Sequence, residues 1–428
     1  MNAADTTWML MATALVLLMT PALAFFYGGL VRSKNALNTM MMSFVALGCV
    51  GVAWPLLGFS LAFGPGTPLL GDLSAVLLRG VGLDPAAGAT FPRLLFCSYQ
   101  GTFAIITAAL ISGAIVERMR FLPYVAFIAI WSLAVYSTVA HWVWGGGWLA
   151  RLGALDFAGG TVVHITAASA ALVAALMIGP RKDFARHAVL PHNVPFTLLG
   201  AGLLWFGWFG FNGGSALAVN GAAVLAFCNT LMAPSVTLLV WVALDLGRTG
   251  KVTAAGGATA IVVGLVAITP AAGYVSPLSA MAIGALVAFP SHYAISYRSR
   301  TRLDDSLDVV AAHGVGGVTG ALLTGVFAQK AWGAPVDGLL FGNARLLLIQ
   351  AIAVAATIGF TVAATGALLK VVALFAALTS SPAEQGQGLD ISQHGEEAYT
   401  SGDGALLLLS ETLPRKSALL VPTEGGAR

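Results

Sequence analysis

Apolar runs of about 20 residues recur along the chain, and short charged or Gly/Pro-rich breaks separate them. A helix needs about 20 apolar residues to cross the hydrocarbon core of a bilayer. The pattern therefore predicts an all-α membrane protein with eleven spanning helices, whose ends are defined to within a few residues. The predicted spans lie near residues 8–31, 40–63, 93–116, 121–143, 157–179, 194–211, 218–245, 252–271, 278–295, 308–327 and 345–377.

Composition supports a polytopic membrane protein. Hydrophobic residues fill 58% of the 428 positions and charged residues only 9%, whereas a soluble protein keeps about a quarter of its residues charged. The net charge of +3 is too small to indicate nucleic-acid binding. Cys49, Cys97 and Cys228 all fall inside apolar runs, and their spacing predicts neither a disulfide framework nor a metal site. We expect no cofactor.

The first 29 residues, MNAADTTWMLMATALVLLMTPALAFFYGG, admit two interpretations. PALA resembles the cleavage site of a secretory signal peptide, but the basic n-region of such a peptide is missing. Asp5 is the only charge before the apolar run, and cleavage after Ala24 would divide a segment long enough to span. We favour a retained first helix with its N-terminus outside, and a cleaved leader is the alternative.

Lysine and arginine are distributed unequally between the two sets of loops. Cytoplasmic loops of membrane proteins carry an excess of these residues, so the richer set is predicted to be cytoplasmic. An odd number of spans then places the N-terminus outside and the segment after about residue 378 inside. The richer set is Arg32, Lys34, Arg118, Arg120, Arg181, Lys182, Arg186, Arg248, Lys251, Arg298, Arg300 and Arg302; the poorer set is Arg79, Arg93, Arg151, Lys330 and Arg345.

A weak internal repeat relates helices 1–5 to helices 6–10. FFYGGL (25–30) closes the first helix, and GFNGGS (210–215) closes the sixth. Because five spans is an odd number, two such halves insert with opposite orientation, which is a recurring transporter architecture. The sequence therefore predicts inverted halves at about 8–179 and 194–327, followed by an eleventh helix.

The repeat also relates two Asp–His pairs. Asp156 and His164 belong to the fifth helix, Asp305 and His313 to the tenth, and each pair is eight residues apart. Eight residues correspond to about 12 Å of helix, which brings both histidines near the middle of a bilayer core about 30 Å thick. A single buried histidine is often only a packed core residue, but ionisable residues at matched depth usually mark a transport path or a proton relay.

Asp156 and the nearby glycines also have structural interpretations. Asp156 precedes a helix start, where its carboxylate can cap free backbone N–H groups. Glycines in DFAGGTVVH (156–164) and in HGVGGVTG (313–320) allow helices to approach closely. Close packing of this kind would hold the histidines in one geometry.

Aromatic residues gather at the predicted outer end of the histidine path. HWVWGGGWL (141–149) follows the fourth helix, and its tryptophans could form nothing more than an interfacial aromatic belt. Aromatic faces also attract a desolvated cation, by about 0.5–2 kcal/mol each, and the hydroxyl of Ser215 could add a hydrogen bond. The aromatic residues predicted at this depth are Tyr99, Phe103, Trp142, Trp144, Trp148, Trp208 and Phe211.

Five segments together resemble the ammonium transporter family (Amt/MEP, relatives of the Rh proteins), in its bacterial Amt form. They are DFAGGTVVH (156–164), HGVGG (313–317), AHWVWGGG (140–147), SYQGTF (98–103) and FGFNGGSA (209–216). The likeness covers about residues 7–400, including span count and loop order. It implies an eleven-helix bundle with a pseudo-twofold repeat, assembled as a homotrimer with one pore in each subunit. It also implies that the trimer lies in a bacterial inner membrane.

The resemblance also implies roles for individual residues. Trp144, Phe103 and Ser215 correspond to the external ammonium site, and Asp156 to the buried acid that shapes and electrostatically supports it. Phe103 and Phe211 correspond to a stacked gate. His164 and His313 correspond to the twin histidines of the pore, with Trp208 in its wall.

The segment after the last helix resembles a regulatory tail. GLDISQHGEEAY (388–399) is similar to the cytoplasmic segment through which bacterial members are controlled, often by a PII-type signalling protein. Residues 401–428 depart from the family pattern, and their composition predicts disorder. We therefore divide the chain into a membrane domain at 1–377 and a cytoplasmic tail at 378–428.

These observations predict a transporter of ammonium, with methylammonium as a further candidate substrate, rather than an enzyme. Neutral ammonia crosses an apolar pore far more easily than a bare cation does, so recruitment, deprotonation and conduction of ammonia would exclude potassium, which has no proton to lose. An ammonium sensor is the first alternative, although the tail is too short for the signalling domain that sensors often carry. An intramembrane metal hydrolase is the second, and it lacks the HExxH spacing.

Overall fold

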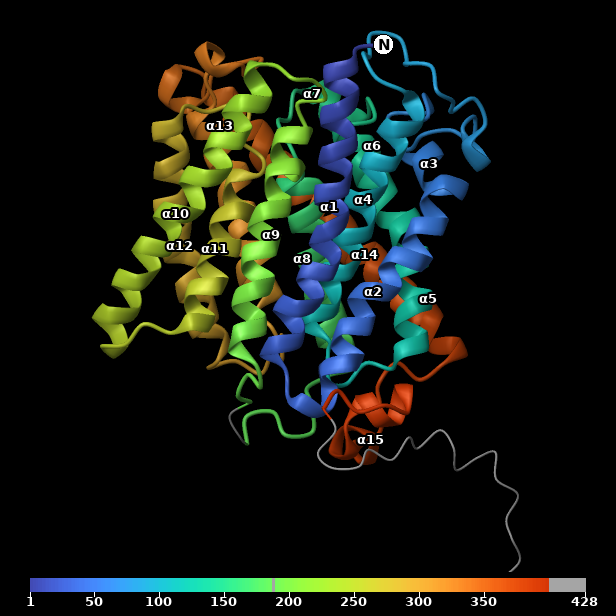
Figure 1. Cartoon of the computed structure of the whole chain (residues 1–428), viewed down its shortest axis with the longest axis vertical. Helices are drawn as coiled ribbons and strands as arrows, with labels where there is room; N and C mark the ends of the chain where they lie inside the picture. Colours follow the sequence, from blue (N-terminus) through green and yellow to red (C-terminus); the bar gives the residue numbers. More distant parts are fainter. Residues whose placement is uncertain (187–188, 400–428) are drawn as a thin grey trace, which may run out of the picture.

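The computed structural model describes residues 1–186 and 189–399, and within them the chain is a bundle of helices without a β-strand (Figure 1). Most helices run between the two ends of the bundle, as expected for spans whose backbone must be hydrogen-bonded internally. Their bounds are α1 (Ala3–Leu30), α2 (Ala36–Ala53), α3 (Phe59–Phe63), α4 (Arg93–Ile111), α5 (Phe121–Trp131), α6 (Ser137–Val143), α7 (Trp148–Leu152), α8 (Thr166–Ile178), α9 (Val194–Gly214), α10 (Gly221–Thr249), α11 (Ala254–Ile268), α12 (Pro277–Arg298), α13 (Gly316–Phe327), α14 (Ala344–Phe375) and α15 (Pro382–Gln387).

Ten helical segments of the described chain are long and apolar enough to cross a membrane. Several of them join two α-helices through a π-helical turn, as where η2 (Trp54–Gly58) connects α2 to α3. The eighth predicted span in chain order, 252–271, corresponds to α11, which is apolar but has only 15 residues. Pro270 lies just beyond its last turn, and a turn follows there in place of further helix.

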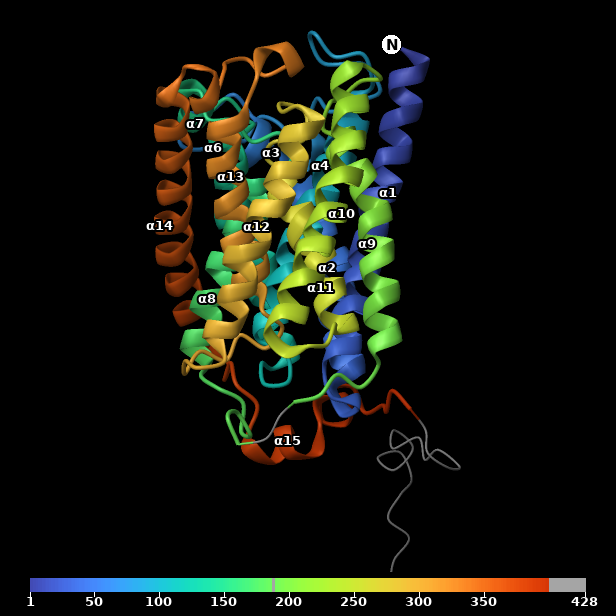
Figure 2. The same ribbon diagram turned by 90° about the vertical axis from the view of Figure 1, so that its left-hand side faces the viewer.

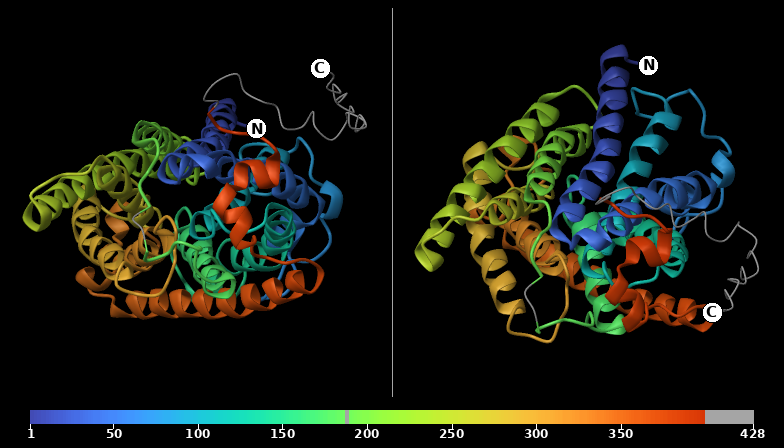
Figure 3. Two further views of the ribbon diagram at one scale, coloured as in Figure 1. Left: turned by 90° about the horizontal axis from the view of Figure 1, so that it is seen from below. Right: turned by 60° about the horizontal axis from the view of Figure 1, so that its bottom comes forward.

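Glycines allow the most extensive helix contact, between α1 and α9. A side-chain carbon at Gly200 would lie 2.3 Å from the backbone nitrogen of Phe26, and one at Gly210 would lie 2.6 Å from Leu15. Small residues therefore allow the two helices to pack backbone against backbone, as in other membrane bundles. The two helices lie side by side in both side views (Figure 2). The long helix α14 crosses one flank of the bundle (Figure 3).

The segment after α14 folds back beneath one end of the bundle, which we call the tail end (Figure 1). There Asp390 accepts hydrogen bonds from the backbone nitrogens of Leu37 and Asn38 at 3.1 and 2.8 Å, and so caps the start of α2. Lys34 donates to the carbonyl of Gly386. Segment 388–399, which resembles the regulatory segment of the family, thus packs on other parts of its own chain. Residues 401–428 of the predicted tail lie outside the described residues.

Candidate functional site

Asp156 shapes the first of two π-helical turns at the centre of the bundle, η6 (Gly160–Ile165). Its carboxylate accepts four backbone N–H groups, from residues 159–162, at 2.7–3.1 Å. Gly159 has φ of +118°, which a residue with a side chain rarely adopts. A side chain at Gly160 would lie 2.6 Å from the ring of Pro270. The capping interpretation of Asp156 is therefore confirmed, and this turn carries His164.

Asp305 holds the second turn, η7 (Val310–Val315), in a related way. Its two carboxylate oxygens accept from the backbone nitrogens of Val309 and Val310 at 3.1 and 2.7 Å. His313 is in this turn, at the same eight-residue spacing from its aspartate. The π-helical geometry was not predicted from the sequence, although such turns occur frequently at functional sites.

The two histidines meet inside the bundle. Their Nδ1 atoms lie 3.2 Å apart, and their ring planes differ by 26°. Both side chains are buried, and Nε2 of His164 has no hydrogen-bond partner among the described residues. They line a cavity of about 10 Å³ whose other walls are mainly apolar, including Leu110 and Val163. A cavity of this size holds roughly one water-sized molecule.

A series of aromatic rings leads away from the histidines toward the end opposite the tail. Phe211 stacks on His164 with ring centroids 6.1 Å apart, and Phe103 stacks on Phe211 at 4.2 Å with an angle of 24°. Trp144 meets Phe103 edge-on at 6.0 Å. Trp208 lies 5.4 Å from His164 and forms part of the cavity wall. The predicted path residues therefore form one continuous series from Trp144 to the histidines.

Hydrogen bonds hold the residues around these rings. The hydroxyl of Tyr99 lies 3.2 Å from that of Ser215, and both hydroxyls contact the backbone carbonyl of Phe211 at 3.0 and 2.8 Å. Trp208 donates to the hydroxyl of Thr269 at 2.9 Å. The phenyl rings of Phe103 and Phe211 have no hydrogen-bonding group, so their faces are positioned by stacking against each other.

Three sequence-predicted residues have more local contacts. Trp142 and Trp148 pack against each other at 5.6 Å, and Trp142 donates to the carbonyl of Leu69, so neither contacts the stacked pair in the way that Trp144 does. The carboxylate of Asp156 is directed at backbone amides, and this residue contacts Trp144 through its carbonyl, which accepts from the indole nitrogen at 2.9 Å.

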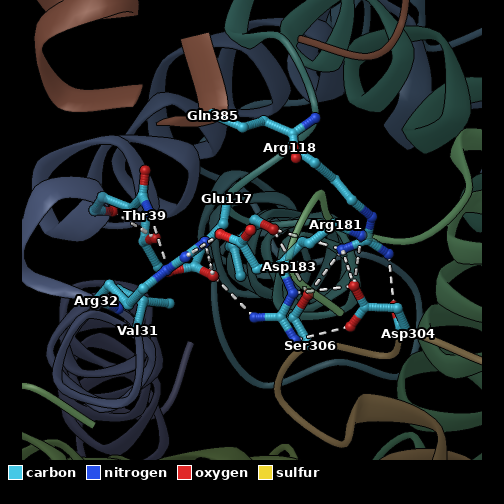
Figure 4. Close-up of polar contacts among 12 residues, drawn as sticks. Val31, Arg32, Thr39, Glu117, Arg118, Arg181, Asp183, Asp304, Ser306 and Gln385 are labelled. Atoms are coloured by element: carbon cyan, nitrogen blue, oxygen red, sulfur yellow. Dashed lines mark hydrogen bonds and ion pairs between the residues drawn. The ribbon is translucent and has the colours of Figure 1, made fainter. Parts of the chain in front are cut away.

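Sequence analysis missed a buried ion-pair cluster at the tail end (Figure 4). Glu117 lies between Arg32 and Arg181 at 3.0 and 2.8 Å, and Asp304 binds Arg181 at 2.7 Å. Arg118 donates to the carbonyl of Asp304 and to Ser306. We call this set the ion cluster: Arg32, Glu117, Arg118, Arg181, Asp183, Asp304 and Ser306. In the sequence its arginines were counted only as positive loop residues. The acidic residues that neighbour these arginines along the chain were the signal that could have indicated ion pairs.

Mutual pairing keeps the ion cluster charged despite its burial. Burial opposes ionisation of Glu117, but Arg181 and Arg32 outweigh it and hold the pKa of this carboxyl at about 2. Burial likewise opposes ionisation of Asp304, and Arg181 and Arg118 lower its pKa below the ordinary value. Buried charges that are fully paired tolerate desolvation, whereas removing one partner is costly. The cluster therefore joins four loops, and Asp304 directly precedes the aspartate that holds η7.

Comparison with known proteins gives one family. The profile described as the Ammonium Transporter Family matches residues 7–399. An ammonium transporter of Bacillus subtilis is 46% identical over 402 residues, which are 93% of this chain and 99% of that one, and the ammonium transporter Amt1 of Archaeoglobus fulgidus is 44% identical over 404 residues, or 94% and 100%.

Solved structures agree with the sequence comparison. The crystal structure of Saccharomyces cerevisiae Mep2 superposes with a TM-score of 0.82 at 36% identity, and covers 87% of this chain and 85% of its own. A structure described as a Sensor Amt Protein superposes with a TM-score of 0.85 at 32% identity, over 91% of this chain and 98% of that one.

Proposed function

Because this chain belongs to the ammonium transporter family, we propose that it recruits ammonium at Trp144, where the cation gives up a proton to water on the outer side, and conducts ammonia along the paired histidines. Proteins of this family are transporters, so the chain is not an enzyme. One observation carries the proposed mechanism. Two buried histidines, with Nδ1 atoms 3.2 Å apart, lie at the inner end of an otherwise apolar path. This path begins at a stack of aromatic rings.

Recruitment is assigned to Trp144, Phe103 and Ser215. The faces of Trp144 and Phe103 would attract the cation, and the hydroxyl of Ser215 would accept one of its hydrogens. Asp156 would support this site through its negative charge, because the backbone carbonyl of the same residue accepts a hydrogen bond from Trp144 and so holds the carboxylate nearby. Potassium would be attracted here as well but has no proton to release.

Conduction is assigned to the region below this site. Phe103 and Phe211 stand face to face and would form a gate that excludes water until their rings move apart. Beyond the gate, ammonia would find hydrogen-bonding groups at His164 and His313, while Trp208 and apolar side chains form the walls. A cation left unpaired in this space would be strongly disfavoured, so ionic leak would be suppressed.

We also propose the finer architecture. α11 would also cross the membrane, which would bring the number of crossings to eleven, and the two halves would be inverted repeats, which the matched aspartate caps of η6 and η7 support. The tail end, with its excess of arginine, would face the cytoplasm of a bacterial inner membrane. The chain would assemble as a homotrimer, with residues 1–377 as the membrane domain, and segment 388–399 would be the surface for a PII-type protein.

Transport can be tested in proteoliposomes that contain a pH-sensitive dye. After an ammonium jump, ammonia entry raises the internal pH, and a parallel recording on a solid-supported membrane shows whether charge moves. We expect protein-dependent alkalinisation, and no response to an equal potassium jump. Protein-free liposomes define the background of lipid permeation.

An ammonium sensor is the second candidate, and the likeness to the Sensor Amt Protein is the observation that favours it. A sensor would bind ammonium, detectable as quenching of tryptophan fluorescence, with flux no greater than that of protein-free liposomes. That result would contradict the transport proposal.

A further inference from the structure

A buried histidine outside the proposed pore, His141, joins two segments at the end of the bundle opposite the tail. It belongs to the last turn of α6, which packs beside α3 (Figure 1). Its Nδ1 lies 2.9 Å from the carbonyl oxygen of Ala62, in the last turn of α3, and its Nε2 lies 2.7 Å from the carbonyl oxygen of Thr67. Only 1% of its surface is exposed. Both ring nitrogens are therefore shielded from water and face backbone carbonyls.

These two contacts require both nitrogens of the imidazole to donate. A carbonyl oxygen only accepts hydrogen bonds, and a neutral imidazole has one N–H group and one bare nitrogen. In either neutral tautomer, the lone pair of a bare nitrogen would face a carbonyl oxygen at 2.9 or 2.7 Å. The imidazolium form donates at both positions, and the shorter of the two distances is typical of a charged donor.

Helix ends favour a positive charge at this position. The carbonyl end of a helix is partially negative and stabilises a cation. The ends of α3 and α6 meet at His141, and each of these helices continues a longer one, α3 through η2 from α2 and α6 through η5 from α5. Two helix ends therefore offset the cost of burying the charge.

Acidic side chains on the neighbouring elements are engaged elsewhere. Asp72 accepts from Ser74 within its own loop, and the carboxylate of Asp156 accepts the backbone amides of η6. Among the described residues, His141 forms no ion pair, and its ring contacts are the two carbonyls. The titratable or charged groups on the elements that contact α6 are Asp72, Tyr136, Arg151, Asp156, Arg345 and Lys370.

The loop after α3 also holds the segment that carries Trp144. The indole nitrogen of Trp142 donates to the carbonyl of Leu69 at 2.8 Å, and the backbone nitrogen of Trp148 donates to the carbonyl of Pro68 at 2.9 Å. Trp144 lies between these two contacts along the chain. The histidine therefore belongs to a set of contacts that fix the backbone on both sides of Trp144.

We propose that His141 is an imidazolium that positions Trp144 by fastening its segment to α3 and the following loop. The positioning role rests on the proposed function of Trp144, whereas the protonation state does not. Loss of one ring hydrogen leaves a bare nitrogen opposite a carbonyl oxygen and so weakens this attachment. The recruitment site is therefore complete while the ring is protonated, and it loosens as the pH rises and the proton is lost.

The protonation of His141 can be observed directly by NMR. Protein labelled with nitrogen-15 in its histidines and placed in lipid bilayers gives different signals for protonated and bare ring nitrogens. The variants His141→Gln and His141→Asn identify the signals of this residue by their loss. We expect two protonated nitrogens at neutral pH. A bare nitrogen there would overturn the inference, whether or not the protein transports ammonium.

The same two variants test positioning because each keeps one contact. The side-chain nitrogen of asparagine can replace Nδ1 and that of glutamine can replace Nε2, so one variant keeps the bond to Ala62 and the other the bond to Thr67. We expect each to raise the half-saturating ammonium concentration by roughly threefold to tenfold, with a smaller change in maximal flux, because a hydrogen bond behind a binding residue is lost. The control His192→Gln changes a histidine at the tail end and should behave as the wild type.

The pH profile separates positioning from a general loss of structure. Concentrations are expressed as the ammonium ion, so that its own equilibrium with ammonia does not enter. The half-saturating concentration of the wild type should rise over the pH interval in which NMR shows His141 losing its proton, and this step should be absent in His141→Gln. Equal half-saturation and equal profiles in the two proteins would overturn the positioning role. A protonated His141 in a protein without ammonium flux would instead contradict the proposed function.

Discussion

The turns η6 and η7 carry the two histidines at equal spacing from an aspartate, but their surroundings differ. Asp156 alone accepts four backbone amides of η6, and a glycine with positive φ and a proline ring complete the turn. Asp305 accepts only two amides of η7, and the residue before it belongs to the ion cluster. One turn is thus fixed by a single residue and its own backbone, the other by charges on several loops.

This difference indicates how each half is coupled to the tail. η6 has no ion pair among the described residues, and it reaches the tail through α8, whose last carbonyl, that of Ile178, accepts from the hydroxyl of Thr379 at 3.3 Å. η7 follows Asp304, which binds Arg181 and Arg118, and the carbonyl of Arg118 accepts from the backbone nitrogen of Ser380 in the tail. The geometry of His313 is therefore connected to the tail through buried ion pairs, whereas that of His164 is connected through a single hydrogen bond at the far end of α8.

The largest effect on transport should come from the histidines themselves. His164→Ala and His313→Ala should each reduce selective ammonium flux by roughly tenfold to a hundredfold, because ammonia would lose a hydrogen bond worth about 1–3 kcal/mol in an otherwise apolar space. The measurement is dye alkalinisation in proteoliposomes at matched protein content. His192→Ala, which removes a loop histidine, is the control. If both pore variants kept wild-type flux and still excluded potassium, the twin-histidine role would be wrong.

Substitution of the two aspartates should lower the free energy of unfolding by different amounts in the two turns. An asparagine at position 156 keeps one acceptor oxygen and faces two backbone N–H groups with its own NH₂ group, so Asp156→Asn should cost about 2–5 kcal/mol. Asp305→Asn leaves one such N–H group and should cost about 1–3 kcal/mol. Unfolding in detergent measures both. Equal losses would remove the distinction between the turns.

Transport by Asp156→Asn sharpens the same comparison. We expect flux to fall in the folded protein as well, because the negative charge behind the proposed cation site is lost. Normal flux in a folded variant would leave Asp156 as a cap alone.

Acidification should affect the ion cluster next. The pKa of Glu117 is lowered from 4.5 to about 2, so its contribution is complete above pH 4.5 and is lost as the pH falls toward 2. The shift corresponds to about 3 kcal/mol. Hydrogen exchange at low pH should therefore rise in residues 310–315 before residues 160–165. Glu117→Gln should flatten this dependence, whereas Asp84→Asn, an exposed loop variant, should not; similar profiles for both turns would contradict the assignment.

The smallest effect should come from the tail. Truncation after residue 387 removes Asp390, the cap of α2, at a cost of about 1–2 kcal/mol, and it should lower transport or its response to nitrogen status while the assembly stays intact. Truncation after residue 399 keeps the cap and is the matched control. Identical behaviour of the two truncations and the wild type would show that the docked segment is not regulatory.

The helices could be predicted from the sequence because each depends on local information, whereas the aromatic residues and histidines were assigned through the resemblance to the family. Ten predicted spans agree with helices that are long and apolar enough to cross a membrane, since hydropathy over a window of that length is a strong signal. The one shorter helix ends at Thr269–Pro270, a signal that was present in the sequence.

The remaining features depend on contacts between distant residues. A π-helical turn differs from an α-helix by one residue per hydrogen-bonded turn. In η6 one carboxylate accepts four successive amides, and the spacing of residue types does not encode such an arrangement. The ion cluster pairs Arg32 with Glu117 and Arg181 with Asp304, over 85 and 123 positions. Loop charges sorted by sign alone give orientation, but they give no partners.

In the proposed pore, the contact between the two Nδ1 atoms gives the histidine pair two alternative arrangements of its hydrogens. When both rings are neutral, one Nδ1 carries the shared hydrogen and the other accepts it, so the two Nε2 atoms are in opposite states, one bare and one protonated. A proton that enters at the bare Nε2 and leaves from the protonated one inverts this arrangement. A second proton cannot then cross in the same direction until the imidazole hydrogens return to the first arrangement. The passage of neutral ammonia does not change this arrangement.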